Sequence, residues 1–332
     1  MGEINIKTKV VQSHSFDPWF NLAVEEYLLN HVQDREVILY LWQNDQTVVI
    51  GRNQNAWKEC AWEQLEKDGG KLARRLSGGG AVFHDLGNLN FTFLTAKKHY
   101  DLEKQLAVIL HALKKFGVQA EFSGRNDLIL EGRKFSGHAY YFHGSAAFHH
   151  GTILINTDME KLTRYLKPSE KKIVSKGVDS VRSRVINLSE VSSRITVPEV
   201  RDSLRESFAQ IYGHAVETVL DANDPEIRKN YAKYASWEWR FGQTPSFDLS
   251  LSERFSWGEI ELGFRLQNGK IDSCTAYSDA MDEDLIGKIP EALKGHVLQK
   301  DALITALQSV AEEKKGTVII DDLIRWLESM EI

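Results

Sequence analysis

The spacing of apolar residues near the start of the chain predicts alternating helices and strands. Asp17 is a capping residue followed by Pro18, and the apolar positions after them recur at helical spacing, at Phe20, Val24, Tyr27, Leu28 and Leu29. Apolar runs at 37–42 and 47–51 predict two short strands around an Asn44-Asp45 turn, and a helix is predicted near 61–68.

The pattern changes to strands after Gly70. Residues 74–94 predict a strand, a glycine loop, a second strand, a turn at Gly87 and a third strand. Residues 102–116 have the spacing of a helix, and β-branched and aromatic residues again dominate 120–155. The first half of the chain is therefore predicted to be mixed α and β.

The second half predicts one long helix and then a separate unit. A cap and a proline open a helix over 196–213. Aromatic residues with Gly and Pro at 235–248 indicate a connection, and beyond it Asn268-Gly269 is typical of a hairpin turn ahead of two C-terminal helices. Since a domain takes roughly 150 residues, the 332 residues predict two domains, 1–246 and 247–332.

The charge of the chain is unevenly distributed. It has 41 Lys and Arg against 47 Asp and Glu, a net charge of −6. This balance argues against a general nucleic-acid binder, because neutralising phosphates takes a basic excess. Residues 161–184 hold eight basic and two acidic side chains, which leaves −12 on the rest. Two interpretations stay open for this segment, a mobile basic flap that closes over polyphosphate and a solvated basic face.

Other features exclude several classes of protein. The longest apolar runs in this sequence are about six residues, against the roughly 20 that span a bilayer. The N-terminus has no targeting pattern, so we expect a cytoplasmic protein. Cys60 and Cys274 are too few for a disulfide framework and have no CxxC spacing. Four histidines lie close in sequence without the spacing of a zinc site, at His138, His143, His149 and His150.

The segment RRLSGGGAVFHDLGNLNF at 74–91 is a candidate anion site. Gly78, Gly79 and Gly80 can expose backbone N–H groups, and the guanidinium groups of Arg74 and Arg75 stand beside them. The segment matches neither GxxxxGK[ST] nor GxGxxG, so it is not a P-loop. A flexible hairpin tip with a solvated arginine pair is the alternative.

A lysine is the second candidate, within SGRNDLILEGRKFSGHAY at 123–140. If 133–141 is a strand, alternation predicts one face with Lys134, Ser136 and His138, and an opposite face with Phe135, Gly137, Ala139 and Tyr141. Gly137 and Ala139 would then allow close packing behind the lysine. A solvated lysine is the alternative.

Taken together, these segments resemble the lipoate-protein ligases of the bacterial two-domain kind. RRLSGGGAVFHD resembles the family's RRxxGGGxVFHD, GRKFSGHA its KxxGxA, HHGTILIN its HGTLLxN, and SKGVDSVRSRV its adenylate-loop signature. WRFGQTPSF at 239–247 is similar to the motif before the family's accessory domain. The resemblance implies an α+β fold, with a mixed-sheet catalytic domain like that of biotin ligases and a smaller α+β accessory domain.

The resemblance implies a reaction in two steps. Free lipoate and MgATP give lipoyl-AMP and pyrophosphate, and a lysine of an apo lipoyl domain then takes the lipoyl group. Lys134 is the implied catalytic residue, because a fixed cation between a carboxylate and an α-phosphate removes their repulsion. The implied acceptors are lipoyl domains of 2-oxoacid dehydrogenase E2 subunits and the glycine cleavage H protein.

The same matching implies three sets of ligands. The ATP and adenylate ligands are Arg75, Gly80, Ala81, Val82, Phe83, Asn126, Asp127, Lys134, Lys176, Ser180 and Arg182. The lipoate ligands are Arg75, Ser77, Gly78, Gly79, Lys134, Gly137 and His150. Asp127 is the implied ligand of Mg²⁺, which usually takes one or two carboxylates plus phosphate oxygens.

Two other functions remain open at this stage. Related octanoyl- and lipoyl-transferases move the acyl group between carrier proteins without ATP and use a cysteine thiolate, but Cys60 and Cys274 lie outside all the matched motifs. A non-catalytic lipoate or nucleotide binder could keep the fold, although the presence of Lys134 argues against it. A biotin ligase is disfavoured, because the GRGRxGR-type loop is absent.

Overall fold

The structure is a computed structural model that describes residues 6–123, 126–167, 185–241, 249–267, 270–313 and 318–330. The chain divides into two compact units. Unit 1 comprises residues up to Ile50, 56–75 and 81–240. Unit 2 comprises 51–55, 76–80 and 241–332, so two short segments of the first half belong with the C-terminal part. The predicted boundary at 246/247 lies outside the described residues.

Unit 1 is built on an eight-stranded mixed sheet with the order β11-β1-β2-β6-β10-β9-β8-β7. β1 runs parallel to both β2 and β11, and the other pairings are antiparallel. The strands are β1 (Lys7–Gln12), β2 (Glu36–Trp42), β6 (Asn88–Ala96), β7 (Glu121–Phe122), β8 (Asp127–Leu130), β9 (Arg133–His143), β10 (Ala146–Leu154) and β11 (Ala215–Thr218). Together with the helices, this confirms the predicted mixed-sheet α+β class.

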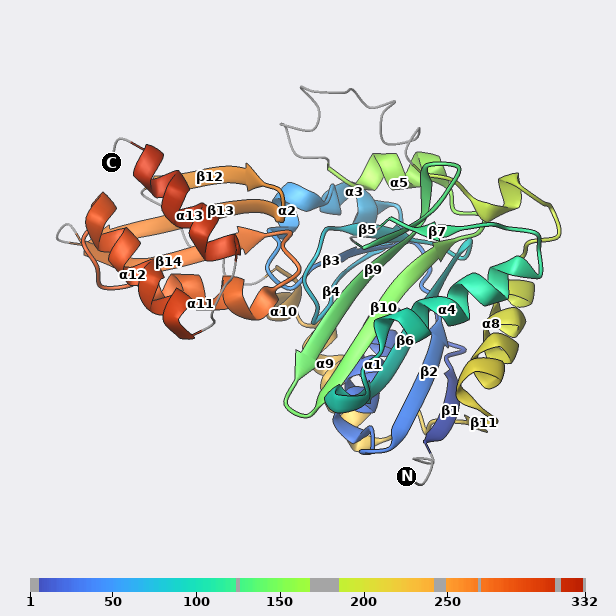
Figure 1. The fold of residues 1–332 in the computed structure, drawn as a ribbon. Helices are drawn as coiled ribbons and strands as arrows, with labels where there is room; N and C mark the ends of the chain where they lie inside the picture. The colour runs from blue at the N-terminus through green and yellow to red at the C-terminus, as the bar shows by residue number, and fades with distance from the viewer. Residues whose placement is uncertain are drawn as a thin grey trace. The chain divides into compact units, whose positions relative to one another are not determined.

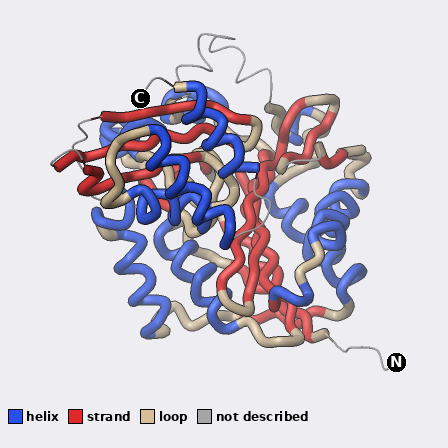
Figure 2. The backbone as a smooth tube through the Cα atoms, turned by 60° about the vertical axis from the view of Figure 1, so that its left-hand side comes forward, coloured by secondary structure: helices blue, strands red, loops and turns tan. Residues whose placement is uncertain are grey.

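Helices cover this sheet on both sides, as Figures 1 and 2 show. On one side lie α4 (Leu102–Lys114) and α8 (Val197–Tyr212), whose apolar residues join those of the sheet in one buried cluster. On the other side lie α1 (Pro18–His31) and α9 (Pro225–Ala235), which pack on each other. The predicted helices at 17, 102 and 196 are therefore confirmed, with Asp17 and Asp101 capping the first two through their side chains.

A smaller sheet of three strands completes unit 1, with the order β4-β3-β5. It is formed by β3 (Thr47–Ile50), β4 (Lys71–Arg74) and β5 (Val82–His84). The remaining short helices of this unit are α2 (Ala56–Glu59), α3 (Trp62–Lys67), α5 (Met159–Tyr165), α10 (Trp237–Phe241), η1 (Lys97–His99) and η2 (Leu188–Glu190). The predicted order of strand, glycine loop, strand, turn and strand over 74–94 is thus confirmed as β4, loop, β5, turn and β6.

Unit 2 has its own apolar core between a sheet and helices. The antiparallel strands β12 (Leu249–Phe255), β13 (Gly258–Gln267) and β14 (Lys270–Ser278) form the sheet, so the predicted hairpin is confirmed, while its turn at 268–269 lies outside the described residues. Three helices follow rather than the two predicted: α11 (Glu283–Leu293), α12 (Lys300–Glu313) and α13 (Val318–Ser329). Pro290 inside α11 masks that helix in the sequence.

None of the helices in the described part of the chain combines the length and the apolar character needed to cross a bilayer.

Candidate active site

A β-bulge in β9 decides where Lys134 points. Lys134 pairs with Ile129 and Ser136 pairs with the preceding residue, Leu128, so Phe135 is an extra residue on β9. The bulge breaks the alternation of the strand, and the ring of Phe135 is buried in the core on the α4 side. The prediction that Lys134 shares a face with Ser136 and His138 is therefore wrong.

Lys134 lies instead on the face of Gly137. A methyl group at Gly137 would stand 2.7 Å from Lys134 Nζ and 2.9 Å from Cε, so the side chain of the lysine occupies the space that the glycine leaves free. Gly137 therefore makes room for the lysine on the same face of the sheet. The prediction from a regular strand placed it on the opposite face. The backbone of Lys134 is also held, because its carbonyl accepts a 2.9 Å hydrogen bond from the N–H of Ile186.

The ammonium group of Lys134 is paired with a carboxylate. Its Nζ lies 2.8 Å from Asp127 Oδ1, and both side chains are about one-third exposed, at 35% and 29%. Asp127 pairs with Gly137 across the two strands, which places it on the same face. Asn126 contributes its carbonyl to the N–H of His138 at 2.8 Å. The structure thus brings together Lys134, Asp127 and Gly137 on one face of β9. The first is a cation, the second is an anion, and the third leaves space for the lysine side chain.

A row of side chains crosses the large sheet from this point on the same face. The N–H of Gly137 donates to Thr152 Oγ1 at 3.3 Å, Thr152 pairs with Asn90, and Asn90 pairs with Trp42. Three strand spacings separate Gly137 from Trp42, on the order of 14 Å. This row is referred to below as the Gly137–Trp42 row.

A buried carboxylate lies beside the row. Glu25 of α1 is 1% exposed and accepts hydrogen bonds from Thr92 Oγ1 at 2.6 Å and from His150 Nδ1 at 2.8 Å. Trp42 Nε1 donates in turn to Thr92 Oγ1 at 3.0 Å. His150 was predicted, but Glu25, Trp42 and Thr92 were not. A glutamate among the apolar positions of the first helix was the available signal, because an acid on a core-facing side needs a partner.

His138 and His149, whose spacing in the sequence is not that of a metal site, lie on the opposite face of the sheet. His138 Nδ1 is 2.6 Å from His149 Nε2. On either side of this pair, His138 Nε2 lies 3.0 Å from Ser136 Oγ and His149 Nδ1 lies 3.0 Å from Gln105 Oε1. Burial, with Lys134 and His150 adding to it, lowers the pKa of His138 to about 3. Burial also lowers the pKa of His149 well below its usual value. These rings are neutral members of the core at ordinary pH.

Arg75 is fixed by the small sheet. Its N–H donates to the Ile50 carbonyl at 3.0 Å, and its Nη1 donates to the Val49 carbonyl at 3.2 Å. The neighbouring Arg74 differs, because its guanidinium group donates to the carbonyls of Trp239 and Arg240 in α10 at 2.9 Å each. Arg74 therefore has a structural role in unit 1.

The predicted nucleotide ligands after the glycine loop lie at the start of β5. Val82 and Phe83 belong to this strand, and Ala81 precedes it. Phe83 is buried against Tyr165, with ring centroids 5.7 Å apart. Burial first, and the charges of Arg75 and His150 second, lower the pKa of His84 to about 3. Phe83 and His84 are thus neutral groups packed inside unit 1.

The glycine loop at 76–80 belongs to unit 2. The N–H of Gly79, at a φ of +88°, donates to the Ala280 carbonyl at 3.1 Å, so this group is already engaged. A methyl group at Gly78 would stand 2.4 Å from the same carbonyl, whereas one at Gly80 would meet nothing within 4 Å. Ser77 is fully buried, and its carbonyl accepts from the N–H of Arg52 at 2.9 Å. The prediction that the glycines expose their N–H groups therefore does not hold for Gly79.

Three predicted ligands, Lys176, Ser180 and Arg182, lie outside the described residues. Among the residues that are described, no group of three or more His, Cys, Asp or Glu is placed to hold a metal ion. The two cysteines are poor nucleophiles, because burial raises the pKa of both Cys60 and Cys274 to about 12.

Comparison with known families gives two matches that together cover most of the chain. Residues 17–209 match the model described as the lipoyl protein ligase A/B catalytic domain. Residues 244–327 match the model described as the bacterial lipoate protein ligase C-terminus.

Several solved structures are similar to this chain. One is P. falciparum LipL1 in complex with lipoate, at 31% identity and a TM-score of 0.85, with 97% of this chain and 100% of that one covered. A bi-partite lipoate protein ligase and its E2 lipoyl domain from Thermoplasma acidophilum matches at 26% identity and a TM-score of 0.66, covering 74% and 100%. Lipoate-protein ligase A bound with ATP matches at 26% and 0.62, covering 72% and 99%.

Proposed function

Since this chain belongs to the lipoyl protein ligase A/B family, we propose that it is an ATP-dependent lipoate-protein ligase. It activates free lipoate with MgATP to lipoyl-AMP, releasing pyrophosphate, and transfers the lipoyl group to a lysine of an apo lipoyl domain. The acceptors are lipoyl domains of 2-oxoacid dehydrogenase E2 subunits and the glycine cleavage H protein, and the use of free lipoate makes the reaction one of salvage.

The observation that carries this proposal is the placement of Lys134. Its ammonium group is held over Gly137 and beside Asp127, where it is partly exposed and can reach a ligand. In the first step it attracts both the lipoate carboxylate and the α-phosphate, which removes their repulsion and stabilises the charge that develops between them. In the second step it donates a hydrogen bond to the acyl carbonyl and so polarises it toward the incoming amine.

The Gly137–Trp42 row gives the acyl chain a direction. A carboxylate at Lys134 leaves an extended eight-carbon chain free to run across β10 and β6 toward Trp42. The span of this row, on the order of 14 Å, is sufficient for such a chain. Trp42 and His150 then stand near the tail, and Gly137 near the carboxylate.

The residues present also suit MgATP. Arg75 supplies a guanidinium group whose terminal Nη1 donates to the Val49 carbonyl, and Ala81, Val82 and Phe83 follow the glycine loop into β5. Asp127 supplies one hard oxygen ligand, and Mg²⁺ commonly takes one or two carboxylates and completes its shell with phosphate oxygens and water. The metal would neutralise phosphate charge, while Lys134 acts on the carboxylate side. From the resemblance of the motifs, we also propose Gly80, Asn126, Lys176, Ser180 and Arg182 as ligands of ATP.

The ATP-independent transferase is the competing function. It needs a thiolate that forms a thioester, yet burial raises the pKa of Cys60 and of Cys274 to about 12. A thiol with such a pKa is almost entirely protonated at neutral pH and attacks carbonyls slowly. The described cysteines thus favour the ligase.

Pyrophosphate release and lipoyl-AMP formation test the proposal. Both should depend on ATP and lipoate together, and an apo lipoyl domain should gain the lipoyl mass. Lys134→Ala should abolish lipoyl-AMP formation with little change in the melting curve, because the lysine is partly exposed and forms a surface ion pair. Arg133→Ala is the matched control, since Arg133 is the neighbouring cation on β9 and pairs with Glu190.

Two results would contradict the assignment. Persistent single-turnover lipoyl-AMP synthesis by Lys134→Ala would show that another group does this work. Complete loss of activity in a cysteine-free variant, with ATP dispensable in the wild type, would favour the transferase.

A further inference from the structure

His84 presents an unusual polar group inside unit 1. It ends β5, is 3% exposed, and packs edge-on against the ring of Trp42, with ring centroids 6.0 Å apart and an interplanar angle of 72°. Its Nδ1 lies 3.1 Å from Asn44 Nδ2. Its Nε2 is buried and has no hydrogen-bond partner among the described residues.

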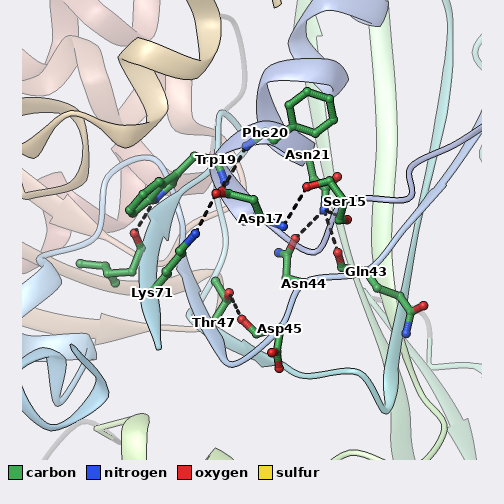
Figure 3. Close-up of polar contacts among 11 residues, drawn as sticks. Ser15, Asp17, Trp19, Phe20, Asn21, Gln43, Asn44, Asp45, Thr47 and Lys71 are labelled. Carbon is green, nitrogen blue, oxygen red and sulfur yellow. Dashed lines mark hydrogen bonds and ion pairs between the residues drawn. The ribbon is translucent and has the colours of Figure 1, made fainter. Parts of the chain in front are cut away.

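The proton of the neutral ring can be placed from the network behind Asn44. The amide nitrogen of Asn21 donates to the carbonyls of Ser15 and Gln43, at 3.0 and 2.7 Å, which fixes its orientation. The same nitrogen contacts Asn44 Oδ1 at 2.9 Å, as Figure 3 shows, so Asn44 turns its oxygen toward Asn21 and its nitrogen toward His84. Since Asn44 Nδ2 is a donor, His84 Nδ1 accepts, and the ring proton resides on Nε2.

The N–H of Nε2 is therefore a donor without an acceptor. Leaving a buried donor unpaired is unfavourable, so such a group calls for an acceptor, for example an atom of a bound molecule. The charged or titratable groups that act on the ring are Arg75 and His150, and neither is an anion that could accept this hydrogen. The network behind Asn44 thus holds a hydrogen-bond donor ready for a bound molecule.

The position of His84 indicates which part of the substrate it meets. Its ring contacts Trp42, at the opposite end of the Gly137–Trp42 row from Lys134. With the carboxylate at Lys134, the group beside Trp42 is the tail of the acyl chain. Lipoate carries two sulfur atoms in a five-membered ring at its tail, and divalent sulfur is a weak acceptor, whereas a plain alkyl tail has no acceptor at all.

On the basis of the proposed function, we propose that His84 is a specificity-determining residue that donates its Nε2–H to a dithiolane sulfur of lipoate. The Asn21–Asn44 pair is the positioning element, because it fixes the tautomer of the ring. An alkyl tail of the same shape would leave this donor unpaired, so the site selects against it.

Binding of a sulfur-free isostere tests this proposal. The probes are lipoate and 5-cyclopentylpentanoate, which has the same ring and chain with carbon in place of sulfur, and the measurement is the Kd of each by titration calorimetry on the full chain. A lost hydrogen bond to a weak acceptor predicts about fivefold tighter binding of lipoate. His84→Met should reduce this ratio to about one, while His84→Gln, whose side-chain amide provides an N–H donor in place of Nε2–H, should keep most of it.

The tautomer can be checked in the wild type without any substitution. Nitrogen-15 spectra of the histidine side chains should show Nε2 protonated in His84 and its resonance shifting with lipoate but not with the isostere. An Nδ1–H tautomer, or an unchanged Kd ratio in His84→Met, would overturn the role of His84 while leaving the ligase function standing. A wild type that binds neither acid and forms no lipoyl-AMP would overturn the proposed function, and this inference with it.

Discussion

Gly137→Ala should move the Lys134 ammonium group without changing the stability of the fold. The new Cβ would stand 2.7 Å from Nζ and 2.9 Å from Cε, whereas ordinary contacts begin near 3.4 Å. Nζ and Cε belong to the far end of a flexible side chain, so the lysine can move instead of the backbone, by an amount on the order of 1 Å. A displacement of this size at a reacting centre can reduce the rate about a hundredfold.

The stability of the variant should barely change. The backbone at Gly137 is not left-handed, so alanine fits it, and alanine in a strand is favoured over glycine by about 0.5–1 kcal/mol. Weakening the partly exposed pair between Lys134 and Asp127 costs about the same or less. We therefore expect the free energy of unfolding to stay within about 1 kcal/mol of the wild type.

The assay is single-turnover formation of lipoyl-AMP, with urea unfolding measured on the same preparation. Gly287→Ala in α11 is the control, because a methyl group there meets nothing within 4 Å, and it should leave the rate unchanged and stabilise the helix. The double variant Lys134→Ala with Gly137→Ala should form lipoyl-AMP no more slowly than Lys134→Ala alone, because the glycine acts through the lysine. An unchanged rate in Gly137→Ala, or a loss of more than about 2 kcal/mol of stability, would refute the reasoning.

Three more outcomes can be checked. Arg75→Ala should weaken ATP binding far more than lipoate binding in separate titrations, and equal losses would show a purely structural arginine. Burial and the neighbouring Asp284 raise the pKa of Glu283 to about 7, so the folded chain keeps a proton between about pH 4.5 and 7 that the unfolded chain loses. Stability should therefore fall as the pH rises through this window, by about 3 kcal/mol, and Glu283→Gln should flatten that slope in thermal melts. His84 and His138 have pKa values lowered to about 3, so the unfolded chain binds their protons first as the pH falls below 6.5, and stability should decline from there toward pH 3. His138→Gln should make this decline less steep in urea titrations.

The elements of the fold were largely predictable, because each has a local signal. Asp17 caps α1 ahead of Pro18, and α8 begins after Thr196 with a proline in its first turn, although the Thr196 side chain makes no capping hydrogen bond. The strands around the glycine loop are bounded by turn residues. The third C-terminal helix was missed because Pro290 lies inside α11, where local rules expect a helix to end. Tertiary packing overrides that rule, since four apolar residues of the same helix are buried in the core of unit 2.

The residues of the site were predictable in kind but not in arrangement. Lys134, Gly137 and Asp127 were found from their motifs, yet the face on which the lysine emerges depends on an extra residue that alternation cannot foresee. Glu25, Trp42 and Asn44 carry no motif, and their importance appears only when distant strands pair. The engagement of Gly79 by Ala280 joins positions about 200 residues apart, which no local pattern encodes.

The bulge at Phe135 also explains why the motif spaces its lysine and glycine by three. In a regular strand, residues separated by an odd number of positions project to opposite faces, so a lysine and a glycine at this spacing could not meet. One surplus residue between them restores a common side. The spacing of the lysine and the glycine therefore depends on the β-bulge between them. Shortening or lengthening this spacing by one residue would turn the ammonium group away from its substrate, even if every side chain in the motif were kept.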